Sequence, residues 1–219
     1  EIEVKEINLK KLPKINTKLM LNLASPGKAF KYHNYPVSGV GLVREEFIFN
    51  NYIKVHPMAL LNHTKLNDFN LTKNIKELCK GFSSEKDYFI KKLSYGISKI
   101  AATFYPKPVI VRFSDFKSNE YFNLLGGKYY EPNEENPMIG WRGASRYYSD
   151  NYKEAFGLEC EAIRYVRNII GLDNVIVMIP FCRTPWECKK VLNTMEEYGL
   201  KKGENSLKVY LMCEIPSNV

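Results

Sequence analysis

Apolar runs of strand length alternate along this chain with longer segments in which apolar residues recur at helical spacing. The apolar runs predict strands at residues 17–23, 37–43, 109–113, 174–181 and 207–215. The helical spacing predicts helices over residues 86–104 and 153–170, and a third helix that ends at Gly199. Alternation of this kind is typical of an α/β fold with a parallel sheet.

The third helix carries a start signal in its sequence. Thr184 is the expected cap, Pro185 takes the first helical position, and Glu187 completes a capping box. Two polar stretches, at about residues 51–84 and 118–136, interrupt the alternation and are predicted to be irregular. No internal repeat or domain boundary is evident, so residues 1–219 are read as one domain.

The composition is that of a globular protein. The chain has 219 residues, of which 45% are hydrophobic and 26% charged, and this excludes disorder as the main state. No apolar run approaches the roughly 20 residues of a membrane helix, so we expect no membrane segment. The first 14 residues lack the apolar core of a signal peptide. The chain has no initiator Met, and we expect it to begin inside a longer protein.

The net charge is +8, from 32 basic and 24 acidic residues. Lysines are interspersed with glutamates, as on an ordinary solvated surface, and no groove-reading motif accompanies the charge. We therefore expect no nucleic-acid partner. A small anion, such as a phosphorylated metabolite, fits the same charge.

Five cysteines are present, at positions 79, 160, 182, 188 and 213. Their number is odd and none forms a CxxC pair, so neither a disulfide framework nor a zinc site is indicated. Free thiols of this kind are typical of a reducing compartment, and we expect a cytoplasmic protein.

Polar residues follow the predicted strands, where parallel α/β folds bind ligands. Guanidinium groups bind phosphate and carboxylate bidentately, so several arginines at one edge would form an anion site. A carboxylate among them favours Mg²⁺, which takes oxygen ligands. For each residue taken singly, a salt bridge is the simpler interpretation. The candidates are Arg44, Arg112, Arg142, Arg146, Arg183 and Glu214.

Other residues give weaker signals. Gly39-Val40-Gly41 is a GxG fragment without the third glycine or acidic partner of a dinucleotide site. The three histidines, His33, His56 and His63, stand in no recognisable motif, and we expect them to be structural.

Five ordered segments resemble the C-terminal PEP/pyruvate-binding barrel of phosphoenolpyruvate (PEP) synthases, also called pyruvate, water dikinases. Pyruvate phosphate dikinase and enzyme I of the sugar phosphotransferase system share this domain. The resemblance covers most of the chain and is weakest at about residues 51–84. The segments are GVGLVREEFIF (39–49), VIVRFSDFKSNEY (109–121), ENPMIGWRGASRYY (135–148), VIVMIPFCRT (175–184) and VYLMCEIPSNV (209–219).

The resemblance implies a (β/α)8 TIM-type barrel, of which we count about six of eight strands. It also implies a reaction in which ATP phosphorylates a histidine on a separate domain, and the phosphohistidine converts the enolate of pyruvate to PEP. By motif, Arg44 and Arg112 would hold the phosphoryl group and substrate oxygens, with Arg142 near the phosphate. Glu214 would ligate Mg²⁺, the implied cofactor.

Parts of the family pattern are missing from this chain. We find neither the Asn-Asp pair nor the catalytic cysteine of the last strands, and neither the phosphohistidine segment nor an ATP-binding loop. We therefore expect a partial domain whose partner is the phosphohistidine domain of the same full-length protein, and no net PEP synthesis by this chain alone. An open barrel has an unpaired edge, which predicts a homo-oligomer. The alternatives are another PEP-utilising phosphotransferase, a non-catalytic anion-binding module, and an inert fragment.

Overall fold

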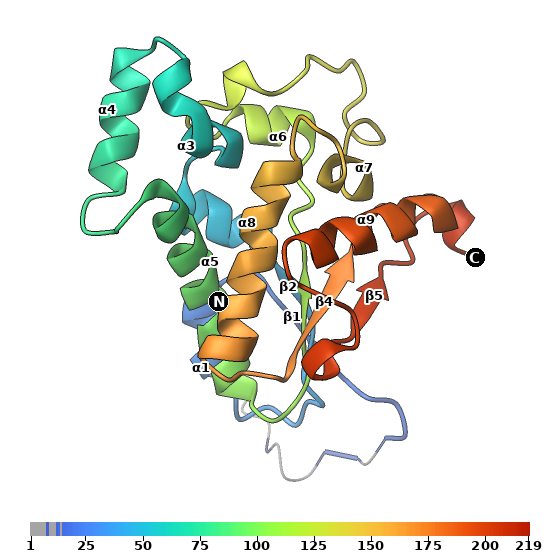
Figure 1. Ribbon diagram of the computed structural model, residues 1–219. Helices are drawn as coiled ribbons and strands as arrows, with labels where there is room; N and C mark the ends of the chain where they lie inside the picture. Colours follow the sequence, from blue (N-terminus) through green and yellow to red (C-terminus); the bar gives the residue numbers. More distant parts are fainter. Residues whose placement is uncertain (1–7, 9–11, 14) are drawn as a thin grey trace, which may run out of the picture.

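The structure is a computed structural model that describes residues 8, 12–13 and 15–219. Its centre is a parallel sheet in the order β1-β2-β3-β4-β5, which follows the order of the chain (Figure 1). The sheet is open, since β1 and β5 are edge strands and do not pair with each other. The strands are β1 (Leu21–Leu23), β2 (Val40–Arg44), β3 (Val109–Arg112), β4 (Val175–Ile179) and β5 (Val209–Leu211).

These strands are the five whose positions the apolar runs predict, each shorter than or shifted from its run. The count of about six was too high for the described residues, which contain five. The α/β class and an incomplete barrel agree with the parallel, unclosed sheet.

Two long helices pack side by side against the sheet. They are α5 (Glu85–Phe104) and α8 (Lys153–Arg164), and α8 continues into a π-helical turn at Tyr165–Ile169 (Figure 1). Ser84 caps α5, because its hydroxyl accepts a hydrogen bond from the backbone N–H of Asp87 at 3.1 Å. The buried stripe of α5 includes Phe89, Leu93, Ile97, Ile100 and Phe104, as the helical spacing predicts.

Helix α9 (Pro185–Glu197) begins where the sequence predicts. The Thr184 hydroxyl accepts a hydrogen bond from the backbone N–H of Glu187 at 3.1 Å, and Pro185 is the first helical residue. The predicted capping box is only half formed. The Glu187 carboxylate accepts from the backbone N–H of Arg183 at 2.6 Å instead of that of Thr184.

The prediction of an irregular segment at about residues 51–84 was wrong. It contains α3 (Pro57–Asn62), a 3-10 turn at His63–Lys65 and α4 (Phe69–Leu78). The Asp68 carboxylate caps α4 by accepting from the backbone N–H of Leu71 at 2.9 Å. Leu71 and Ile75 form a short buried stripe, which polar neighbours on the exposed side hide in the sequence.

The remaining helical elements are short. They are α1 (Ala29–Tyr32), α2 (Glu45–Ile48), α6 (Ser118–Phe122), α7 (Ala144–Tyr147), a π-helical turn at Phe49–Ile53, and 3-10 turns at Pro26–Lys28, Gly127–Tyr129, Glu204–Ser206 and Pro216–Asn218. Helices α3, α4, α6 and α7 lie beyond the carboxyl-terminal ends of the strands (Figure 1). Among the described residues, no helix has the length and apolar character needed to cross a membrane.

Candidate functional site

Two arginines end adjacent strands and lie next to each other. Arg44 is the last residue of β2 and Arg112 the last of β3, and the sheet register pairs them directly. Both line a pocket of about 280 Å³ at the carboxyl-terminal edge of the sheet, and Arg142, from the loop before α7, lines it as well. The structure therefore brings together the three arginines that the sequence nominates as substrate-binding residues.

Arg112 is buried and paired with two carboxylates. Its Nη2 donates to Glu46 Oε1 at 2.9 Å, and its Nη1 lies 2.8 Å from Asp115 Oδ2. The Glu46 oxygen also accepts the backbone N–H of Asp115 at 2.6 Å. Burial raises the pKa of Glu46, and the charge of Arg112 opposes that shift. Leaving a buried charge without its partner is costly, so this pairing fixes the Arg112 guanidinium in one place.

Arg142 shares Asp115 with Arg112. Its Nε donates to Asp115 Oδ1 at 2.8 Å, and its Nη2 to Asp115 Oδ2 at 3.2 Å. A bidentate contact of this kind fixes direction as well as distance. The guanidinium also lies over the Phe181 ring, 4.2 Å from its centroid. One aspartate thus aligns two arginines that lie thirty residues apart in the chain.

The residue after Arg142 is a glycine for steric reasons. Gly143 has φ +59° and is the N-cap residue immediately before α7. A Cβ atom there would lie 2.7 Å from the carbonyl oxygen of Pro180 and 2.9 Å from the Phe181 side chain. The backbone can approach the end of β4 this closely only without a side chain.

Arg44 differs from the other two arginines of the pocket. It is half-buried, and within the described part of the chain no acidic residue pairs with it. Its Nε, like that of Arg112, is buried without a hydrogen-bond partner there. No carboxylate among the described residues holds the Arg44 guanidinium, which leaves this group available to a ligand anion.

The pocket as a whole has an excess of positive charge. Its four basic side chains are Arg44, Arg112, Arg142 and Lys117, and its three acidic ones are Glu46, Asp115 and Glu120. The fixed guanidinium groups present N–H donors to the cavity, and the balance of charge favours an anion.

Glu214 lies beside this pocket and not in its wall. It is exposed, and its Oε1 accepts the backbone N–H of Phe181 at 2.8 Å. Phe181 has a left-handed φ of 47°, and its ring is the one that Arg142 covers. Partial burial and the nearby charge of Asp115 raise the pKa of Glu214, against the opposing charges of Arg112 and Arg142.

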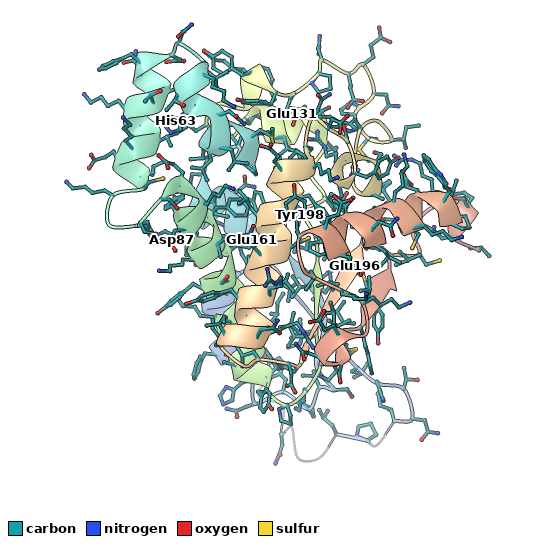
Figure 2. All side chains as sticks on the ribbon, in the orientation of Figure 1. His63, Asp87, Glu131, Glu161, Glu196 and Tyr198 are labelled. Carbon is teal, nitrogen blue, oxygen red and sulfur yellow. The ribbon has the colours of Figure 1, made fainter. Side chains whose placement is uncertain are left out.

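Arg146 and Arg183 act as structural clamps outside the pocket. Arg146 is fully buried, pairs with Glu131 and stacks 4.0 Å from the Trp141 ring centroid. Glu131 lies on the side of the molecule beyond the carboxyl-terminal ends of the strands (Figure 2). Arg183 donates to the carbonyl oxygens of Gly140 and Phe181 at 3.1 and 3.2 Å, which fastens the Arg142 loop to the end of β4.

Comparison with known proteins gives the family. Residues 2–219 match the family described as PEP-utilising enzyme, PEP-binding domain. The chain belongs to this family. It is similar to curated proteins named phosphoenolpyruvate synthase: 53% identical to that of Aquifex aeolicus and 50% to that of Escherichia coli, each over 100% of this chain, and 56% to that of Synechocystis over 99%. It spans only 31%, 27% and 27% of those relatives, respectively.

Membership of the PEP-utilising family raises the question of a metal. Among the described residues, no group of three or more His, Cys, Asp or Glu side chains could hold a metal ion. Mg²⁺ needs only one or two protein carboxylates when substrate and water supply the other oxygens. Glu214 fits as a single ligand of that kind, since it is an exposed carboxylate next to the arginine pocket. The Asp115 carboxylate is already bound to two guanidinium groups.

The acidic residues of the pocket were not among the predicted site residues. Glu46 lies two positions after Arg44, and Asp115 lies three positions after Arg112. This short spacing is the sequence feature that could have indicated acidic partners for the arginines. Lys117, also in the pocket, belongs to the same DFK segment. Of the histidines, His56 is fully buried: its Nδ1 accepts the backbone N–H of Met58 and its Nε2 lies 2.9 Å from Glu131 Oε1.

Proposed function

We propose that this chain is the PEP- and pyruvate-binding part of a phosphoenolpyruvate synthase. The observation that carries the proposal is the adjacency of Arg44 and Arg112 at the ends of β2 and β3, in one pocket with Arg142. Family membership and the names of the relatives support the substrate. Pyruvate, its enolate and PEP are all anions with a carboxylate, which matches donors of this type.

Each pocket residue has a role in this proposal. Arg112 and Arg142, held by Asp115, would bind the transferring phosphoryl group and stabilise its charge without reorganising. Arg44, which has no acidic partner among the described residues, would bind a substrate oxygen. Glu214 would hold Mg²⁺, which when bound offsets the negative charge of the enolate oxygen.

The remainder of the reaction is assigned to other parts of a longer polypeptide. The chain spans 27% to 31% of its relatives. We place an ATP-binding domain and a phosphohistidine domain in the remaining length, with this chain as the partial barrel domain. In the proposed transfer, the phosphohistidine N–P bond breaks and an O–P bond to the enolate oxygen forms. The arginines would bind the phosphoryl group while it lies on the line between the histidine nitrogen and the enolate oxygen.

Two further properties are part of the proposal. Strand β5 pairs only with β4 within the described residues, and an open edge of this kind favours association of two copies. Light scattering at high protein concentration would show a dimer, and a monomer throughout would contradict it. All five cysteines are free thiols, which supports a cytoplasmic location. Fluorescence microscopy of a tagged full-length protein in its source cell would test this location.

Binding of oxalate, a planar mimic of the pyruvate enolate, tests the function. We expect Mg²⁺ and oxalate together to stabilise the chain, by about 2.7 kcal/mol at one hundred times the dissociation constant. Glu214→Gln should remove the part that depends on Mg²⁺. Arg44→Gln should weaken binding by at least about tenfold, which corresponds to one lost charged hydrogen bond. Thermal unfolding and calorimetry measure both effects.

The control is Arg164→Gln, because Arg164 is exposed on α8 and its one hydrogen bond within the described residues goes to the carbonyl oxygen of Tyr198 at 3.4 Å. It should bind as the unaltered chain does. If oxalate gives no stabilisation in a chain that still unfolds cooperatively, the proposed pocket does not bind this ligand class. Binding to polyanions with steep salt dependence and no need for Mg²⁺ would favour the anion-binding module instead.

A further inference from the structure

Every polar atom of Ser114 is bound by a side chain from another element. Ser114 is fully buried and lies between Arg112 and Asp115 in the loop after β3. Its backbone N–H and its hydroxyl both donate to Glu159, at 3.0 and 2.7 Å. Its carbonyl oxygen accepts from the Tyr147 hydroxyl at 2.7 Å. A loop residue is rarely held on all three groups, since most loop backbone bonds to water.

A row of hydroxyl groups leads to the same carboxylate. The Tyr152 hydroxyl donates to that of Tyr121 at 2.7 Å, and the Tyr121 oxygen lies 2.6 Å from the Ser114 hydroxyl. Because the Ser114 hydroxyl donates to Glu159, Tyr121 is the donor to Ser114. Hydrogen bonds in such a chain polarise one another, and a dry interior strengthens them. Glu159 is the acceptor at the end of the chain.

Glu159 lies on α8, forty-five residues beyond Ser114 in the sequence, and is fully buried. It does not line the pocket. It is separated from the pocket by one peptide unit, because the residue after Ser114 is Asp115, which pairs with both Arg112 and Arg142. The Ser114–Asp115 peptide itself is held at its carbonyl oxygen by Tyr147 and at its N–H by Glu46. Glu159 holds Ser114 on the other side of its Cα, and the position of Ser114 sets where the main chain of Asp115 begins.

We propose that Glu159 is a positioning residue of the anion pocket: by holding the N–H and the hydroxyl of Ser114, it fixes the direction in which Asp115 meets Arg112 and Arg142. It touches no ligand. The ligand-binding consequence rests on the proposed function, whereas the positioning itself is a property of the folded chain. Guanidinium groups held in one orientation favour an anion with two matched oxygens, such as a carboxylate or phosphate, because bidentate contact depends on direction.

A purely structural role makes a different prediction. If Glu159 only stabilises the core, its replacement lowers the free energy of unfolding and leaves the arginines in place. If it positions Asp115, the side-chain N–H of Arg142 loses its fixed acceptor while the protein remains folded. The Arg142 Nε–H donates to Asp115 Oδ1 at 2.8 Å, so its exchange with solvent reports on this contact without any ligand.

The experiment is NMR of this chain with nitrogen-15 arginine, comparing the unaltered protein with Glu159→Gln. We expect the Arg142 Nε–H to exchange at least about tenfold faster in the variant, because a loosened acceptor exposes the donor to water. The matched control is Asn174→Ala at the opposite end of the sheet, where Asn174 donates to the carbonyl oxygens of Ala101 and Lys107. It should destabilise the fold and leave the Arg142 signal unchanged.

Oxalate with Mg²⁺ provides a second, separate readout. If the unaltered chain binds it, Glu159→Gln should weaken binding by at least about fivefold, as misplacement of a binding group does. If the unaltered chain does not bind it, the proposed function fails and the arginine exchange still decides the positioning. If Glu159→Gln does not fold, Ser114→Ala removes the hydroxyl contact from the other side and gives the same comparison. Unchanged Arg142 exchange in a folded variant, or equal acceleration in Asn174→Ala, would overturn the proposal.

Discussion

The two ends of the sheet both bury an arginine, and they use it in opposite ways. At the carboxyl-terminal end, Arg112 pairs with Glu46 and Asp115 and lines a pocket of about 280 Å³. At the other end, Arg167 donates to backbone carbonyl oxygens of Asp173, Val175 and Asn205, and the cavity beside it measures about 10 Å³. The Arg167 guanidinium spends its donors on backbone carbonyl groups and fills the space between segments. The Arg112 guanidinium is held by carboxylates at the edge of a cavity and keeps N–H groups available to a ligand.

The largest effect on stability is expected at the carboxyl-terminal end of the sheet, where carboxylates hold Arg112. Arg112→Ala leaves the buried carboxylates of Glu46 and Asp115 without their shared cation, at a cost of about 3–5 kcal/mol in the free energy of unfolding. Oxalate binding should be lost as well. Urea unfolding measures the cost. Arg44→Ala is the comparison, since Arg44 has no acidic partner among the described residues, and an equal loss there would contradict the ionic explanation.

A substitution at the opposite end of the sheet should lower the stability of the protein without weakening ligand binding. Arg167→Ala removes hydrogen bonds to three carbonyl groups and should cost roughly 2–3 kcal/mol. Affinity for oxalate, measured by calorimetry at a temperature where the variant is folded, should stay within about twofold of that of the unaltered chain. A large loss of affinity would show that the two ends are coupled and would remove the contrast between them.

The smallest effect concerns pH. Glu45 and Glu159 are fully buried beneath the pocket. Burial, then the charge of Glu159, raises the pKa of Glu45 well above its usual value, and burial raises that of Glu159 to about 7. The folded state therefore binds more protons than the unfolded state above pH 4.5, so the stability from these groups is lost as the pH rises through about 7.

Glu45→Gln removes one of these ionisations. We expect the variant to match the unaltered chain at pH 5 and to be more stable by about 1–3 kcal/mol at pH 8, measured by urea unfolding. Asn174→Ala, at the other end of the sheet, should cost the same at both pH values. A Glu45→Gln advantage that shrinks as the pH rises would show that the pair is not protonated in the folded state.

The same contrast separates what the sequence could predict from what it could not. Residues 109–113 and 174–181 are continuous apolar runs and predict buried parallel strands, because sheets covered on both faces need them. Arg44 and Arg112 could be placed at one edge, since the ends of parallel strands meet there. Their family role stays a prediction. These parts depend on local pattern, which a single chain displays.

The rest depends on contacts between distant segments. Glu159 lies on the same face of α8 as the buried Phe156 and Ile163, and nothing local shows that its partner is Ser114. Arg146 follows Arg142 closely in the sequence and was a candidate for ligand binding, but its guanidinium pairs with Glu131, which lies fifteen residues earlier. Helix α4 was missed because its buried stripe is short and its cap is a single aspartate. An acid inside an apolar stripe is the one signal that could have indicated Glu159.

Gly143 has a consequence for studies of sequence variation. Any side chain there would collide with the end of β4, although the glycine itself donates nothing to the pocket. In a saturation library selected for binding, position 143 would therefore be as intolerant as Arg142 beside it. Position 142 would be intolerant because its guanidinium group contacts the pocket, and position 143 because there is no room for a side chain. A ranking of positions by mutational sensitivity alone would merge the two, and the size of the replacement that fails, even alanine at 143, is what separates them.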